Sequence, residues 1–94
     1  MMNETRSTVF LCLQANDDTR GVVDAIAQDN PQARLDWHPG MVRITAPGTL
    51  VVRRTTVEDQ VGRDFDLQEL HINMISLSGH VDETDDELSL SWER

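Results

Sequence analysis

The stretch FDLQELHINMISLSG, residues 65–79, decides how this sequence is interpreted as a fold. Its apolar residues alternate with polar ones, first at Leu70, Ile72 and Met74 and then, one position out of phase, at Ile75 and Leu77, followed after the stretch by Val81. A shift of one residue in a period-two pattern is what a β-bulge produces. We therefore predict one bulged strand over residues 70–81, bent near Met74, with both apolar sets facing the core.

The residues before this stretch predict alternating strands and helices. A buried strand is expected over Ser7–Gln14, followed by a helix over Asp18–Asp29 that Asn16 or Asp17 caps. Asn30-Pro31 ends this helix, because the residue before a proline disfavours the α region. Residues 33–37 form a weak strand, and His38-Pro39-Gly40 is a turn.

The middle of the chain predicts either one bent strand or two strand pieces over residues 41–54, interrupted at Ala46-Pro47-Gly48. Thr55-Thr56-Val57-Glu58 has the spacing of a capping box, which predicts a short helix over Thr56–Val61. Gly62 then lies where a left-handed C-terminal cap belongs. Asp66–Glu69 repeats the capping spacing, as one helical turn or as the start of the next strand.

The end of the chain predicts a hairpin. An acidic turn over residues 82–87 precedes a strand in which Leu88, Leu90 and Trp92 alternate with serines. The element order is therefore β-α-β-β-α-β-β in a single domain, residues 1–94. This is a small α+β fold with strongly bent, mostly antiparallel sheets and two to three short helices.

Composition excludes several classes of function. The net charge of −9 argues against binding to nucleic acid or to an anionic membrane surface. No apolar run approaches the roughly 20 residues of a membrane span, and the start, MMNETRST, lacks the features of a secretory signal. Cys12, the single cysteine, suits a reducing compartment. We expect a cytoplasmic protein.

Candidate catalytic and metal sites are weak. Asp82, Thr84, Asp86 and Glu93 match positions of a calcium loop, but Glu87 occupies the position that requires glycine. The three histidines have no metal-ligand spacing. Ser76, Ser78, His80 and Asp82 contain the residue types of a hydrolase, but parallel side chains on one strand do not converge. A polar stripe of His71, Asn73, Ser76, Ser78 and His80 remains, either as an ordinary solvated sheet face or as a docking surface.

The chain resembles the MmoB/DmpM family, the regulatory (effector or coupling) components of bacterial multicomponent phenol hydroxylases and related monooxygenases. The resemblance lies in TVFLCLQANDDTRGVVDAIAQDNPQA, in MVRITAPGTLVVRRTTVEDQVGRDFDLQELHINMISLSG and in the ending DELSLSW. It is closest to the phenol hydroxylase branch, and the middle block is its most specific part.

The resemblance implies a protein without catalytic residues and without metal, flavin or organic cofactor. Such a protein binds a separate hydroxylase with a di-iron centre, acts with the reductase only indirectly, and promotes hydroxylation coupled to oxygen activation. Some members of the family self-associate, so weak self-association is allowed. The family motif and the polar stripe place the hydroxylase-docking candidates at Thr56, Glu58, Asp59, Gln60, Arg63, Asn73, Ser76 and Ser78.

Two alternative functions stay open from the residues. The chain could be a small-ligand-binding regulatory domain of ferredoxin-like order, which requires a pocket. It could also be a small hydrolase that uses His80 and Asp82.

Overall fold

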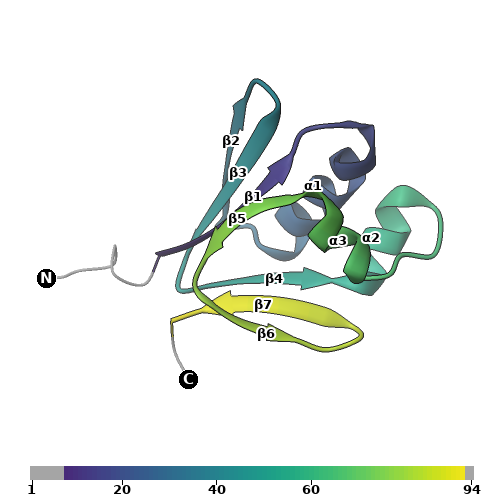
Figure 1. Cartoon of the computed structure of the whole chain (residues 1–94). Coiled ribbons are helices and arrows are strands. Elements are labelled where there is room, and N and C mark those ends of the chain that lie inside the picture. The colour runs from purple at the N-terminus through teal and green to yellow at the C-terminus, as the bar shows by residue number, and fades with distance from the viewer. Residues whose placement is uncertain (1–7, 93–94) are drawn as a thin grey trace, which may run out of the picture.

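The computed structural model describes residues 8–92, which form three helices and seven strands (Figure 1). The helices are α1 (Asp17–Asp29), α2 (Arg54–Val61) and α3 (Gln68–Asn73). The strands are β1 (Thr8–Gln14), β2 (Arg34–His38), β3 (Met41–Pro47), β4 (Thr49–Arg53), β5 (Met74–Ser78), β6 (His80–Glu83) and β7 (Glu87–Ser91). The predicted α+β class is confirmed.

The strands form two antiparallel sheets. The four-stranded sheet has the order β2-β3-β1-β5, and the three-stranded sheet has the order β4-β7-β6. The chain passes from one sheet to the other at Gly48 and again at Gly79, both with positive φ (+83° and +138°). Such φ values favour glycine, because other residues place a Cβ against the backbone. Residues 41–54, predicted as one bent strand or two strand pieces, therefore contain two strands, β3 and β4, in different sheets.

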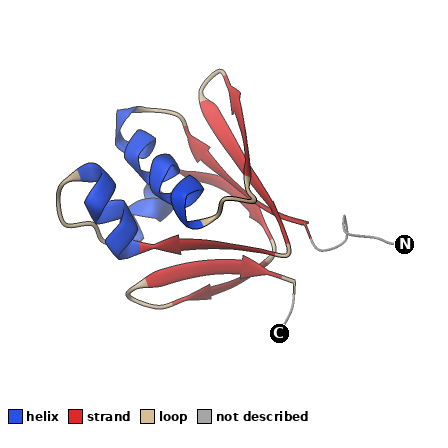
Figure 2. Ribbon diagram, turned by 180° about the vertical axis from the view of Figure 1, so that it is seen from behind, coloured by secondary structure: helices blue, strands red, loops and turns tan. Residues whose placement is uncertain are grey.

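The core lies between the two sheets and α1, and the helices gather on one side of the molecule (Figure 2). Alternate residues of β1, β3, β4 and β7 face inward, as a period of two requires. Leu11, Leu13, Val42 and Ile44 come from the four-stranded sheet, Val23 and Ile26 from α1, and Leu50, Val52, Leu88 and Leu90 from the three-stranded sheet. Removing these side chains from water is the main favourable term for folding.

Helix α1 ends at Asp29, where the sequence predicts, and begins at Asp17, one residue earlier than predicted. Asn16 Oδ1 accepts from the Thr19 amide at 3.1 Å, and Thr19 Oγ1 accepts from the Asn16 amide at 3.1 Å, which completes a capping box. At the other end, Asn30 is the C-cap and is buried. Gly21 lies against α2, where an added Cβ would lie 2.6 Å from Val61 Cγ1, so glycine allows the two helices to approach.

Helix α2 corrects one prediction about its start. It begins at Arg54, with Arg53 as an N-cap whose side chain makes no capping hydrogen bond. The capping box expected between Thr55 and Glu58 is therefore wrong. Thr55 already lies within the helix, and the Glu58 carboxylate accepts hydrogen bonds from Arg54 and from the Phe65 amide instead. The predicted left-handed cap at Gly62 is confirmed, with φ of +76°.

Residues 65–79 correct a second prediction, because the expected single strand over residues 70–81 is α3, β5 and β6. Leu67, Leu70 and Met74 have helical spacing, and they contribute to the core. Reciprocal hydrogen bonds support the start of α3, from the Gln68 amide to Asp66 Oδ1 (2.9 Å) and from the Asp66 amide to Glu69 Oε2 (3.1 Å).

The predicted bulge is present on β5. Cys12 pairs with Ser76, but Leu13 pairs with Met74, so Ile75 is the extra residue. The predicted core face is wrong at three positions, because Ile72, Ile75 and Val81 are 76%, 49% and 38% exposed. Ile72 lies on the outer side of a helix, and Val81 lies on the edge strand β6.

Candidate functional site

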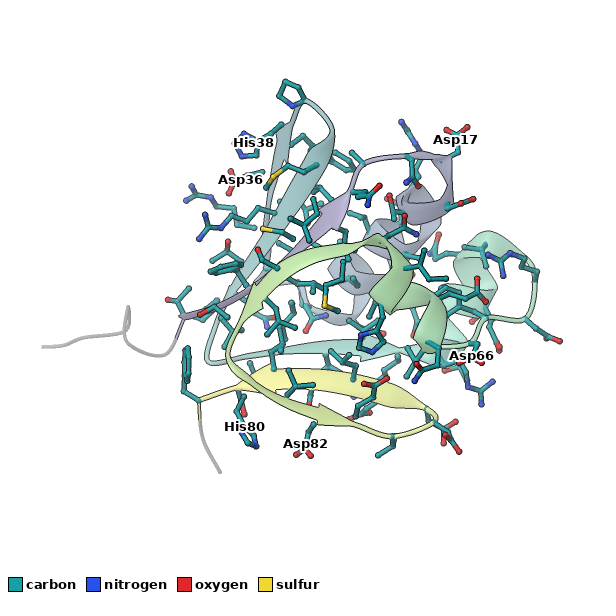
Figure 3. The ribbon with its side chains drawn as sticks, viewed as in Figure 1. Asp17, Asp36, His38, Asp66, His80 and Asp82 are labelled. Atoms are coloured by element: carbon teal, nitrogen blue, oxygen red, sulfur yellow. The ribbon has the colours of Figure 1, made fainter. Side chains whose placement is uncertain are left out.

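A recess lies where the N-terminal half of α1, the loop after α2 and α3 meet. We call it the α1–α3 recess; its volume is about 130 Å³. It is lined by Asp18, Thr19, Val22, Arg63, Phe65, Glu69, Leu70, Ile72 and Asn73. Figure 3 shows Asp17, at the start of α1, and Asp66, just before α3, on the helical side of the molecule. The recess is lined by both apolar and charged side chains, and such a lining can bind an amphipathic group.

Arg63 is held in a fixed position on the wall of this recess. Its guanidinium donates to the Asp64 carbonyl at 2.8 Å and pairs with Glu69 Oε1 at 3.2 Å. The guanidinium carbon lies 6.0 Å from the centre of the Phe65 ring, within cation–π range. The hydrogen bond from the Asp66 amide, together with Arg63, lowers the pKa of Glu69, so Glu69 is charged and balances Arg63.

Glu58 fixes the loop that carries Arg63. Its Oε2 accepts from Arg54 Nη1 at 3.1 Å and from the Phe65 amide at 2.9 Å. Arg54 also pairs with Asp86 at 2.7 Å. Both carboxylates raise the pKa of Arg54, with the largest single effect from the hydrogen bond to Asp86, followed by the charge of Glu58. Glu58, predicted as a docking residue, therefore uses its carboxylate within the chain, between α2, the loop and the β6–β7 turn.

Of the remaining candidates on α2, Gln60 lines a second hollow, which we call the α1–α2 groove. Asp59 and Gln60 are exposed, and Thr56 is half-buried. Gln60 Nε2 donates to Gln28 Oε1 at 2.8 Å and so joins α2 to α1. Gln60 and Arg63 line the α1–α2 groove, together with Asp17, Asp18, Arg20, Gly21, Asp24 and Val61. Because Arg63 and Asp18 line both hollows, the two form one surface.

Asn73 belongs to the same surface, but the two serines do not. Asn73 Oδ1 accepts from Asn16 Nδ2 at 3.1 Å, which joins the end of α3 to the cap of α1. Ser76 and Ser78 pair with Cys12 and Phe10 of β1, so they lie on the sheet face opposite the core. The structure brings Gln60, Arg63 and Asn73 together and places both serines on another face.

Two residues that the sequence assigned to the core are exposed instead, and one of them, Ile72, joins this surface. Ile72 and Ile75 are exposed and flank Asn73 in the chain, and Ile72 lines the α1–α3 recess. Exposed apolar side chains beside a recess are typical of protein-docking sites. The helical spacing of Leu67, Leu70 and Met74 was the signal in the sequence that places Ile72 outside.

The hydrolase and metal alternatives have no supporting geometry in residues 8–92. His80 and Asp82 are exposed on β6 and point away from the body of the molecule (Figure 3), whereas Ser76 and Ser78 belong to the other sheet. Among the described residues, no group of three His, Cys, Asp or Glu side chains could hold a metal ion. Glu93, the last calcium-loop position, lies outside the described residues. No helix within residues 8–92 is long and apolar enough to span a membrane.

Comparison with known proteins decides the family. The family model for MmoB/DmpM matches residues 7–91. The chain belongs to the MmoB/DmpM family. It is 48% identical over 86 residues to the stimulatory component DmpM of phenol 2-monooxygenase from Pseudomonas sp. (strain CF600), covering 92% of this chain and 96% of that protein.

Solved structures of similar chains have the same fold. A chain from a phenol hydroxylase–regulatory protein complex is 46% identical and has a TM-score of 0.87. The match covers 92% of this chain and 99% of that one. Regulatory protein B of soluble methane monooxygenase is 20% identical, with a TM-score of 0.73 over 99% of this chain and 70% of that one. The second likeness concerns the fold alone.

Proposed function

We propose that this member of the MmoB/DmpM family is the non-catalytic regulatory component of a phenol hydroxylase. It binds the di-iron hydroxylase component and promotes hydroxylation that is coupled to oxygen activation. The 48% identical relative is a stimulatory component of phenol 2-monooxygenase, which supports the proposal. A similar chain has been solved in a complex of phenol hydroxylase with its regulatory protein.

The observation that carries the docking proposal is the exposure of two isoleucines at one corner of the molecule. Ile72, on α3, is 76% exposed and lines the α1–α3 recess, and Ile75, three residues later on β5, is 49% exposed. Interfaces combine a few apolar anchors with a polar rim. Arg63 and Asn73 supply polar groups beside Ile72 in the recess, and Gln60 supplies one in the adjoining groove.

The other candidates take different roles in this proposal. Thr56 and Asp59 extend the contact along α2. Glu58 is a positioning residue, because its carboxylate holds the Phe65 amide and Arg54. Ser76 and Ser78 lie on the outer face of the four-stranded sheet and would contact only a partner that also wraps around β5.

Regulation then follows from binding alone. A protein without reacting groups changes a reaction in its partner only by binding one conformation of that partner more tightly than the others. Moving an equilibrium from 1:99 to 99:1 requires an affinity difference of about 10⁴-fold. We place this action in the cytoplasm, and the free, buried Cys12 is consistent with a reducing compartment.

The test measures the affinity of the hydroxylase for variants of the exposed isoleucines. Ile72→Ser removes a proposed anchor, and Val81→Ser is the matched control, because Val81 is also exposed but lies on β6. Isothermal titration with the hydroxylase should give a Kd at least about tenfold higher for Ile72→Ser, which corresponds to about 1.4 kcal/mol. Equal Kd values for the two variants would remove this corner from the interface. Ser76→Lys in the same titration separately tests the sheet face.

A further inference from the structure

We infer that the α1–α3 recess receives one lysine or arginine side chain of the hydroxylase, with its cationic group beside Asp18. The inference rests on the proposed function and adds the chemical class of the group that the recess binds. Three observations carry it: the size of the recess, the arrangement of its apolar and charged residues, and the charge that its own ion pair leaves unbalanced.

The size of the recess suits a single side chain. Its volume of about 130 Å³ is below the roughly 300–1,000 Å³ of sites that bury a whole small molecule. A small-ligand regulatory domain would need a larger cavity at this position. One long side chain that projects from a partner fits the available space.

The lining suits a side chain that is apolar along its length and charged at its end. Val22, Phe65 and Leu70 line the recess as almost fully buried apolar residues, and Ile72, which is 76% exposed, provides most of the accessible apolar surface. Lysine and arginine lay their methylene groups along such surfaces and keep the charged end near polar groups. A carboxylate partner would instead meet Asp18 and Glu69, both negatively charged residues.

The charge that remains in the recess is negative. Arg63 and Glu69 balance each other at 3.2 Å. Asp18 forms no ion pair with any residue between positions 8 and 92. The adjoining groove adds Asp17 and Asp24 against one further cation, Arg20.

Covering Asp18 with a partner therefore requires a cation. A carboxylate that loses its water without gaining a donor costs free energy, whereas a paired one recovers that cost through charge-assisted hydrogen bonds. The net charge of −9 on the whole chain also favours approach of a basic surface.

The experiment compares Asp18→Asn with Asp82→Asn in titrations of the hydroxylase at low and high salt. Both variants remove one exposed negative charge, and Asp82 lies on β6 and does not line the recess (Figure 3). We expect Asp18→Asn to raise Kd about tenfold at low salt and to reduce the dependence of Kd on salt. Asp82→Asn should stay within about twofold of the wild type, and Asp18→Glu should retain most of the affinity.

The outcomes separate the two proposals. If the wild-type protein does not bind the hydroxylase, the proposed function is wrong. If the wild type binds and Asp18→Asn matches Asp82→Asn in Kd and salt dependence, the cation-binding recess is wrong and the proposed function stands. Circular dichroism and thermal unfolding of each variant check the fold, since Asp18 also lies in the first turn of α1. A folded Asp18→Glu that binds as weakly as Asp18→Asn would also overturn the inference.

Discussion

Asn30 connects α1 to β4, and its replacement by alanine should destabilise the fold strongly. Asn30 is 3% exposed. Its Nδ2 donates to the carbonyls of Ile26 and Val51, both at 2.7 Å, and its Oδ1 accepts from the Val51 amide at 2.9 Å. The side chain therefore takes the place of a neighbouring strand for Val51.

The magnitude follows from these three hydrogen bonds. Each contributes about 1 kcal/mol net, and a buried group left without a partner costs about 1–3 kcal/mol. We expect Asn30→Ala to lower the free energy of unfolding by about 3 kcal/mol, a large share of the roughly 5–15 kcal/mol of a small domain. The melting temperature should fall by about 12–24 °C, from about 4–8 °C per kcal/mol at this size.

Urea unfolding followed by circular dichroism measures this loss, with Gln32→Ala as the matched control. Gln32 lies two positions away, is exposed, and makes one longer bond to the Thr49 carbonyl at 3.3 Å. Its replacement should change stability by less than about 0.5 kcal/mol. A loss below about 1 kcal/mol for Asn30→Ala, with an unchanged urea slope, would refute the reasoning. Because β4 continues directly into α2, the same bonds also help to position the proposed docking surface.

Three further perturbations test the packing, the site and the charge network. Gly21→Ala should lower the free energy of unfolding by about 1–3 kcal/mol despite the better helix propensity of alanine, because the added Cβ would lie 2.6 Å from Val61 Cγ1. When Val61 is also replaced by alanine, urea unfolding should show that Gly21→Ala is neutral or stabilising. Ile72→Ala should leave the free energy of unfolding within about 0.5 kcal/mol of the wild-type value, whereas Leu70→Ala should lower it by about 2–5 kcal/mol. The reason is that Ile72 is 76% exposed and Leu70 is 2% exposed. Similar losses for the two variants would contradict the orientation of α3. The lowered pKa of Glu69 means that its ionised form stabilises the fold at pH values above 4.5, and this stabilisation is lost as the pH falls through the lower folded pKa. Glu69→Gln should therefore melt below the wild type at pH 7, and the difference in melting temperature should shrink as the pH falls below 4.5; a difference that stays constant with pH would argue against this role.

The predictable part of the fold rests on signals that are local in the sequence. Helix α1 was predicted because Asn16 caps it, apolar residues recur at helical spacing, and Asn30-Pro31 ends it. Gly62 was predicted as a left-handed cap for a similar local reason. These features depend on neighbouring residues, so tertiary packing did not overrule them.

The parts that sequence reasoning missed depend on contacts between distant residues. Leu70, Ile72 and Met74 fit a strand, while Leu67, Leu70 and Met74 fit a helix, and both periods share two residues. Packing of Leu67 and Leu70 into the core selects the helix and turns Ile72 outward. The assignment of β3 and β4 to different sheets is likewise set by the whole core.

The candidate site was predictable only in part. Gln60, Arg63 and Asn73 came from the family motif and the polar stripe, and the structure brings them together beside Asp18. Glu58 was ambiguous in the sequence, because a capping role and a contact role need the same carboxylate. Its bond to the Phe65 amide spans seven residues, and no short motif predicts it.

The most direct test of the proposed function is a reconstituted turnover assay. The hydroxylase, its reductase, NADH and phenol are combined with increasing amounts of this protein, and hydroxylated product and hydrogen peroxide are measured together. We predict that product per NADH rises and peroxide per NADH falls, with saturation near a stoichiometric ratio of protein to hydroxylase. Unchanged product and peroxide with the folded protein present would contradict its assignment as the regulatory component.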